Sequence, residues 1–121
     1  MYRGWSLALL MAMSPLALAE SDLGQKTYEA ACQNCHAPNL AGGVKAPAAF
    51  DEKAWSTVFE RAAVKAKENP SQFKTPMDYL LYNVKIGKGL MHHNGLCNES
   101  VTTNCSDEAL TQAIVYMSKK H

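Results

Sequence analysis

Two cysteines and a histidine near the start of the chain have the spacing of a covalent cofactor-attachment site. Cys32 and Cys35 are separated by two residues, and His36 follows directly. At the end of a helix, thiols three positions apart lie on the same side, so both can reach the two vinyl groups of one porphyrin. His36 would then lie beside the ring and offer an imidazole nitrogen to the iron. The motif therefore predicts one haem c per chain, linked by thioether bonds to Cys32 and Cys35.

Two other kinds of site share part of this motif. A thioredoxin-like redox pair would need a βαβ setting, and the sequence pattern around the motif is helical. Half of a zinc site would need a second Cys/His pair at short spacing. Cys97 and Cys105 are eight residues apart, which fits that spacing poorly. Haem is therefore favoured over a redox pair or a zinc ion.

The second axial ligand of the iron is less clearly specified. Met77 and Met117 lie on apolar helical stripes, where packing in the core is the simpler role. Met91 lies in a glycine-bounded loop, from which its thioether could approach the iron from the far side of the ring. His92 and His93 follow directly and are alternatives, as is an open coordination position. A thioether would raise the reduction potential relative to two imidazoles.

Residues 1–19 have the pattern of a secretory signal peptide. Arg3 precedes an apolar stretch, and Ala17-Leu18-Ala19 fits the small-x-small cleavage pattern. The alternative is an uncleaved membrane anchor, but the apolar stretch is shorter than the roughly 20 residues that span a bilayer. We expect cleavage after Ala19, a periplasmic location and one compact domain over residues 20–121.

The expected mature chain carries no net charge, because removing Arg3 leaves 11 basic residues against 11 acidic ones. It therefore lacks the basic patch of a nucleic-acid-binding protein. No stretch after the leader is apolar enough to span a membrane, so membrane contact is expected only through partners.

Four cysteines remain in the mature chain, and free thiols rarely persist in an oxidising compartment. With Cys32 and Cys35 assigned to haem, Cys97 and Cys105 are expected to form a disulfide. The alternatives are free thiols or an intermolecular bond. The disulfide would join the end of the Met91 loop to the start of the last helix.

Apolar residues at helical spacing predict helices joined by loops, with no convincing strand. The clearest start signal is Thr75, followed by Pro76 at the first helical position and Asp78 at the third. The apolar stripes need a partner, which a flat porphyrin between the helices would supply. The expected helices run from about residue 22 into the haem motif, from near residue 51 to Asn69-Pro70, from Pro76 to Gly87, and from after Ser106 to the lysines at 119 and 120.

Together these motifs resemble a class I c-type cytochrome, close to the small bacterial cytochrome c-five group. The resemblance covers most of residues 22–118 and includes the haem motif, Ala46-Pro47, Ala54-Trp55, the segment from Asp78 to Met91, and the last helix. It implies an all-α fold in which about four helices wrap around one covalently bound haem. It also implies that Gly24 and Tyr28 cross the last helix near Leu110 and Tyr116.

The resemblance further implies a role for each site residue. His36 and Met91 would be the axial ligands, and the backbone carbonyl of Pro47 would accept a hydrogen bond from His36. Apart from the resemblance, the Trp55 indole N–H could donate to a haem propionate, or the side chain could simply anchor its helix in the core. The chain departs from the family where His92-His93 stands in place of the usual Pro-Pro after the methionine, which raises the hypothesis of a pH-dependent ligand switch.

The expected function is that of a one-electron carrier without catalytic residues. It would shuttle electrons between a membrane donor complex and a terminal oxidase or reductase. The alternative is an electron-transfer subunit of a larger periplasmic oxidoreductase complex. An enzyme or gas sensor is disfavoured, because a two-haem peroxidase needs a second Cys-x-x-Cys-His motif, which the sequence lacks.

Overall fold

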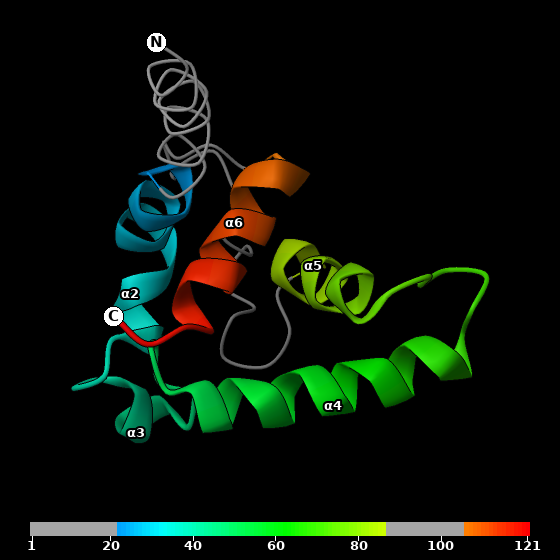
Figure 1. The fold of residues 1–121 in the computed structure, drawn as a ribbon, viewed down its shortest axis with the longest axis horizontal. Helices are drawn as coiled ribbons and strands as arrows, with labels where there is room; N and C mark the ends of the chain where they lie inside the picture. The colour runs from blue at the N-terminus through cyan, green and yellow to red at the C-terminus, as the bar shows by residue number, and fades with distance from the viewer. Residues whose placement is uncertain (1–21, 87–105) are drawn as a thin grey trace, which may run out of the picture.

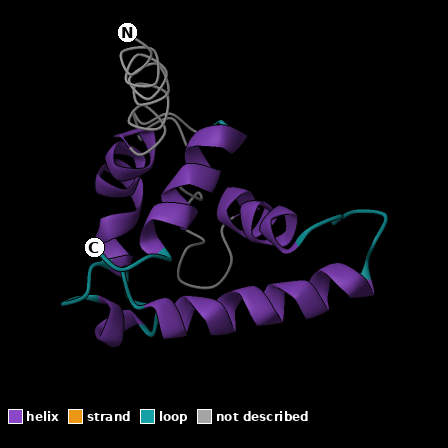
Figure 2. Ribbon diagram, in the orientation of Figure 1, coloured by secondary structure: helices purple, strands orange, loops and turns teal. Residues whose placement is uncertain are grey.

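The computed structural model describes residues 22–86 and 106–121. Within these residues the chain is helical and contains no strand (Figure 1, Figure 2), which confirms the expected all-α fold class. Helix begins at the first described residue. The elements are residues 22–27, the π-helical turn η1 (Tyr28–Cys32), α2 (Gln33–His36), α3 (Ala41–Val44), α4 (Glu52–Glu68), α5 (Pro76–Ile86) and α6 (Asp107–Met117).

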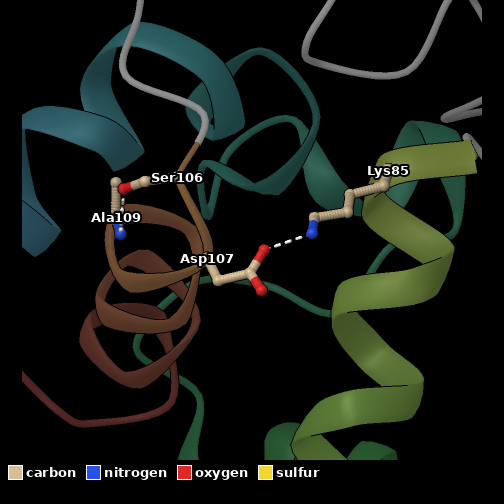
Figure 3. Close-up of polar contacts among 4 residues, drawn as sticks. All are labelled: Lys85, Ser106, Asp107 and Ala109. Atoms are coloured by element: carbon tan, nitrogen blue, oxygen red, sulfur yellow. Dashed lines mark hydrogen bonds and ion pairs between the residues drawn. The ribbon is translucent and has the colours of Figure 1, made fainter.

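Two long helices begin at side-chain caps. The Asp51 carboxylate accepts a hydrogen bond from the Ala54 N–H at 3.1 Å at the start of α4. The Ser106 hydroxyl accepts one from the Ala109 N–H at 3.1 Å at the start of α6 (Figure 3). Each cap satisfies an N–H group that has no partner inside the helix, which is why these starts were readable from the sequence.

The start of α5 is a reciprocal cap between Thr75 and Asp78. The Asp78 N–H donates to the Thr75 hydroxyl at 3.1 Å, and the Thr75 N–H donates to the Asp78 carboxylate at 3.0 Å. Pro76 stands between them at the first helical position, where its missing N–H costs no hydrogen bond. The predicted start of this helix is therefore confirmed.

The connection over residues 37–50 lies between the first two expected helices, and the sequence predicted no helix in it. The structure has the short helix α3 there. The turn that leads into α3 is closed by the N–H groups of Leu40 and Ala41, which donate to the Ala37 carbonyl at 2.8 and 2.9 Å. In α3 itself the Lys45 N–H donates to the Ala41 carbonyl. Lys45 ends α3 with a left-handed backbone, φ 57°. Gly42 and Gly43 have low helix propensity, so the sequence concealed this turn.

The first helix also contains a wider turn that the sequence did not reveal. In η1 the Gln33 N–H donates to the Tyr28 carbonyl, five residues back instead of four. The haem motif follows directly, with Cys32 at the end of η1 and Cys35 in α2. Single π turns of this kind are rare in proteins, and those that occur often lie at functional sites.

The helices pack around one apolar core. Figure 1 shows α6 between α2 and α5, with α4 running along one side of the molecule; α4 packs against α5, and α6 packs against both η1 and α5. An ion pair between Lys85 and Asp107 also joins α5 to α6 (Figure 3). The buried core cluster comprises Tyr28, Ala31, Cys32, Ala49, Trp55, Leu81, Leu110, Ala113, Ile114 and Met117.

The crossing of the first helix over α6 depends on Gly24. A Cβ atom at this position would lie 2.6 Å from the Gln112 carbonyl oxygen and 3.3 Å from the Tyr116 Cβ, so only glycine allows this approach. One turn later, the rings of Tyr28 and Tyr116 lie 5.5 Å apart. The expected crossing of these two helices is therefore confirmed.

Candidate haem-binding site

An apolar cavity of about 330 Å³ lies between the helices. It is bounded by η1, α2, α4, α5, α6 and the segment before α4, so residues far apart in the sequence meet around it. Its size and mostly aliphatic walls are typical of a cofactor site. The lining residues are Cys32, His36, Pro47, Trp55, Val58, Arg61, Leu80, Asn83, Val84, Leu110, Ala113, Ile114 and Met117.

His36 lies at this cavity with one ring nitrogen already bonded. Its Nδ1 is 2.8 Å from the Pro47 carbonyl oxygen, as the family resemblance implied. A carbonyl only accepts hydrogen bonds, so Nδ1 must carry the proton, which leaves a lone pair on Nε2. Burial lowers the pKa of His36, while the hydrogen bond to Pro47 opposes this shift. The imidazole is therefore held neutral, which is the form that ligates a metal.

Residues 47–51, which we call the strap, connect the His36 segment to the end of α6. The Ala49 N–H donates to the His36 carbonyl at 2.7 Å, and the Phe50 N–H donates to the Met117 carbonyl at 2.7 Å. Both His36 and Met117 line the cavity. The strap thus fixes the backbone on two sides of the site at once.

Trp55 lies in the cavity wall with its polar atom engaged inside the protein. Its indole N–H donates to the Ala48 carbonyl of the strap at 2.9 Å, and the side chain is buried. Its ring lies 5.6 Å from the His36 ring. This geometry favours the packing role of Trp55 over donation to a haem propionate.

Cys32 and Cys35 differ in their surroundings. Cys32 is buried and lines the cavity, whereas Cys35 is half-buried, and both are free thiols. Burial raises the pKa of the Cys32 thiol to about 12. A thioredoxin-like redox pair needs a lowered thiol pKa instead. The described residues also hold no cluster of three or more His, Cys, Asp and Glu side chains that could bind a metal ion alone.

The residues present fit a haem. Cys32 at the cavity supplies a thiol, His36 supplies a ring nitrogen with a free lone pair, and the aliphatic lining suits a porphyrin face. Two further polar side chains, Arg61 and Asn83, line the same cavity. Their hydrogen-bond donors suit the two propionate groups that a haem carries.

Sequence reasoning missed Arg61 and Asn83. Arg61 follows Trp55 and Val58 at three-residue intervals on α4, so it continues the face of that helix that lines the cavity. A basic residue on this otherwise apolar face was the available signal. Asn83 directly precedes Val84 on α5 and gave no comparable signal.

The sequence offered several candidates for the second axial ligand of the iron. Met91, His92 and His93 lie outside the described residues, and so does the predicted disulfide between Cys97 and Cys105. The two described methionines that the sequence offered differ: Met117 lines the cavity, whereas Met77 packs against the core and does not line it. Met117 is therefore the described methionine to test against Met91.

A helical domain with a Cys-x-x-Cys-His motif beside an apolar, histidine-lined cavity defines a class I c-type cytochrome. The family model described as "Cytochrome C oxidase, cbb3-type, subunit III" matches residues 19–117, and the chain belongs to this family. Its domain serves haem-based electron transfer. No curated protein and no solved structure matched the chain. The finer resemblance to the c-five group stays a prediction.

None of the described helices is both long enough and apolar enough to cross a membrane.

Proposed function

We propose that the chain is a periplasmic one-electron carrier with one haem c linked to Cys32 and Cys35, and with His36 and Met91 as axial ligands. The observation that carries the proposal is the 2.8 Å contact between His36 Nδ1 and the Pro47 carbonyl at the edge of an apolar cavity. It fixes the tautomer and leaves Nε2 free for iron.

The haem supplies the one-electron couple between ferrous and ferric iron. His36 stays neutral and oriented, because its other nitrogen is bonded to Pro47. The apolar residues of α5 and α6 that line the cavity would exclude water from a bound haem, and a dry site disfavours the extra charge of the ferric form. No proton transfer and no substrate site are needed, which is why the proposed protein is a carrier and not an enzyme.

The ligand set is tested by substituting the two methionines in parallel. Met91→Leu is expected to abolish the Met–iron charge-transfer absorption of the ferric protein and to let the ferrous protein bind carbon monoxide. Met117→Leu is the matched control, because it makes the same substitution, of nearly unchanged volume, at the other methionine. It should keep the absorption. If only Met117→Leu abolished it, Met91 would be the wrong ligand. A bis-histidine spectrum in the unsubstituted protein would favour His92 or His93.

The signal peptide and the periplasmic location are tested together. The exported protein should begin at Glu20 when its N-terminus is sequenced. A product that keeps Met1 would contradict cleavage after Ala19 and favour the uncleaved membrane anchor.

A second candidate function is an electron-transfer subunit of a larger periplasmic oxidoreductase complex. The family description, which names an oxidase subunit, favours it. The chemistry at the haem would be the same, but the partner would be permanent. Size-exclusion chromatography of the mildly purified protein separates the two: a carrier elutes at the mass of the chain alone, and a subunit elutes in a stable hetero-complex.

A further inference from the structure

Phe50 has a backbone conformation that its residue type disfavours. Its φ angle is 72°, in the left-handed region where glycine and asparagine are common and bulky residues are outliers. In the part of the chain that the structure describes, Lys45 is the other non-glycine residue with a positive φ. Such strain persists only where the surrounding structure enforces it, and it is frequent at functional sites.

The hydrogen bonds around Phe50 identify the turn that requires this angle. The Asp51 N–H donates to the Ala48 carbonyl at 3.3 Å, which closes a four-residue turn with Ala49 and Phe50 at its centre. Only the second central residue, Phe50, has a positive φ. That combination is a type II turn, which ordinarily places glycine at this position.

The more accessible conformation for a bulky residue here is a type I turn, and the two turn types differ by a flip of the central peptide. That peptide carries the Phe50 N–H, which donates to the Met117 carbonyl at 2.7 Å. A flip would therefore break the bond between the strap and α6. The bond from Trp55 to Ala48 lies outside the flipped peptide.

The ring of Phe50 explains how the strained turn is kept. It contacts Tyr116 edge-on at 5.4 Å, Tyr28 at 5.6 Å and His121 at 5.1 Å. Tyr28 and Tyr116 also contact one another where η1 crosses α6. Aromatic contacts of this kind stabilise beyond the area that they bury, and they hold Phe50 where its backbone alone would not stay.

We propose that Phe50 is a positioning residue for His36: its ring, held by Tyr28 and Tyr116, keeps the turn in the type II form that ties the strap to α6. The Pro47 carbonyl then stays on His36 Nδ1. This inference rests on the proposed role of His36 as an iron ligand. A weaker bond to Nδ1 lowers the basicity of the imidazole, so ferric iron is less stabilised and the midpoint potential rises.

The test compares substitutions at position 50 in the haem-loaded protein. Glycine and asparagine adopt the left-handed backbone readily, so Phe50→Gly and Phe50→Asn should keep the turn although the ring is lost. Valine is β-branched and disfavours this backbone, so Phe50→Val should lose the turn. Phe50→Val should lose the hydrogen-exchange protection of the amide of residue 50, shift the His36 Nδ1 proton resonance and raise the midpoint potential. Phe50→Gly and Phe50→Asn should keep all three signals near those of the unsubstituted protein, even if the melting temperature falls.

Lys45 provides the matched control, because it has the same kind of backbone, φ 57°, but caps α3 outside the strap. Lys45→Val should lower the melting temperature and leave the midpoint potential and the amide of residue 50 unchanged. A potential that moved equally in Lys45→Val and Phe50→Val would overturn the proposal, since general destabilisation would then account for both.

A second pair of variants keeps the test decisive if Phe50→Val does not fold. Tyr116→Leu removes one of the two rings that hold Phe50, and it should reproduce the rise in potential and the loss of amide protection. Adding Phe50→Gly to Tyr116→Leu should restore both, because glycine needs no ring to hold the turn. No change in Tyr116→Leu, or no rescue by glycine, would overturn the proposal.

These outcomes are separable from failure of the ligand assignment. If His36→Ala kept the spectrum of the unsubstituted protein, the ligand assignment would be wrong. The amide exchange at residue 50 would still show whether the ring holds the turn.

Discussion

The two walls of the cavity that the haem would occupy are built differently. The wall made by η1 and α6 is closed by the protein itself: Leu110 is 1% exposed, Met117 3% and Cys32 6%. Gly24 lets the backbones of the two helices approach closely, and aromatic rings fill the crossing. This wall needs no further group to bury its apolar side chains.

The wall made by α5 is closed much less completely. Leu81 is its one buried residue, while Met77, Leu80 and Val84 are half-buried although they pack against the core. Leu80 and Val84 line the cavity. A porphyrin placed there would cover them, so this wall depends on the cofactor for part of its burial.

Because the two walls differ, the haem is expected to contribute to stability as well as to chemistry. Covering a half-exposed leucine or valine contributes part of the roughly 1.5–3 kcal/mol that full burial gives. The haem is therefore expected to stabilise α5 more than η1 and α6. Substitutions in the two walls test this contrast between the closed wall and the open wall.

The largest effect is expected from the double substitution Cys32→Ala, Cys35→Ala. Without thioether bonds the haem is not held, and the stability should fall by several kcal/mol, roughly the burial of two or three large side chains. The amides of α5 should lose hydrogen-exchange protection before those of α6. A pyridine haemochrome spectrum checks the loss of haem, and urea unfolding checks stability. Equal loss of protection in both helices would contradict the contrast.

The next effect concerns the closed wall. Gly24→Ala places a methyl group 2.6 Å from the Gln112 carbonyl oxygen, so the crossing must shift. Overpacking of this kind typically costs about 1–3 kcal/mol, and each kcal/mol lowers the melting temperature of a domain this size by roughly 4–8 °C. Calorimetry provides the measurement.

The control for that prediction is Gly42→Ala in α3, where nothing lies within 4 Å of the new methyl group. Since alanine favours helix over glycine by roughly 0.5–1 kcal/mol, this variant should be neutral or slightly stabilised. If both variants lost the same stability, close approach at Gly24 would not be the cause.

A smaller effect is expected at the polar edge of the open wall. Arg61→Gln removes a positive charge that lines the cavity, so the ferrous form loses a stabilising charge and the midpoint potential should fall by roughly tens of millivolts. Lys65→Gln removes the same charge on the same helix at a residue that does not line the cavity. Potentiometric titration should show a clearly smaller shift for Lys65→Gln; equal shifts would argue against a haem contact.

The smallest effect is expected at the ion pair that links the two walls, Lys85 on α5 and Asp107 on α6 (Figure 3). Both side chains are largely exposed, at 47% and 68%, so the pair should contribute less than about 1 kcal/mol. A double-mutant cycle with Lys85→Gln and Asp107→Asn measures it by urea unfolding. The coupling free energy between the two residues should fall in high salt, because salt screens exposed charges. A coupling free energy that high salt did not change would contradict this exposed, screened ion pair.

The parts of the fold that could be read from the sequence are those set by local chemistry. Caps at Thr75 and Ser106 begin helices because a nearby side chain satisfies the first N–H groups. The apolar stripe of the last helix is buried at Leu110, Ala113 and Met117 as its spacing predicted. The haem motif was equally plain, because its chemistry fixes the spacing of its residues.

The parts that could not be read are set by contacts between distant segments. Nothing in the sequence indicated that Phe50 would take a left-handed backbone, since its own preference is the opposite and the surrounding rings decide the outcome. The partner of the Trp55 indole was unreadable for the same reason: it is the Ala48 carbonyl, whose position the strap determines. The place of Arg61 at the cavity needed the packing of α4 on α5.

The π turn η1 sets the rotational phase of the haem motif. A residue in an α-helix advances the helix by about 100°, so one extra residue in an ordinary α-helical turn would rotate everything after it by that angle. Up to the first residue of the turn, Gly24 and Tyr28 face α6; from its last residue onward, Cys32 and His36 line the cavity. Deleting the exposed Ala30 should therefore restore an ordinary helix and leave His36 facing the cavity that it lines, because the wide turn absorbs that one residue.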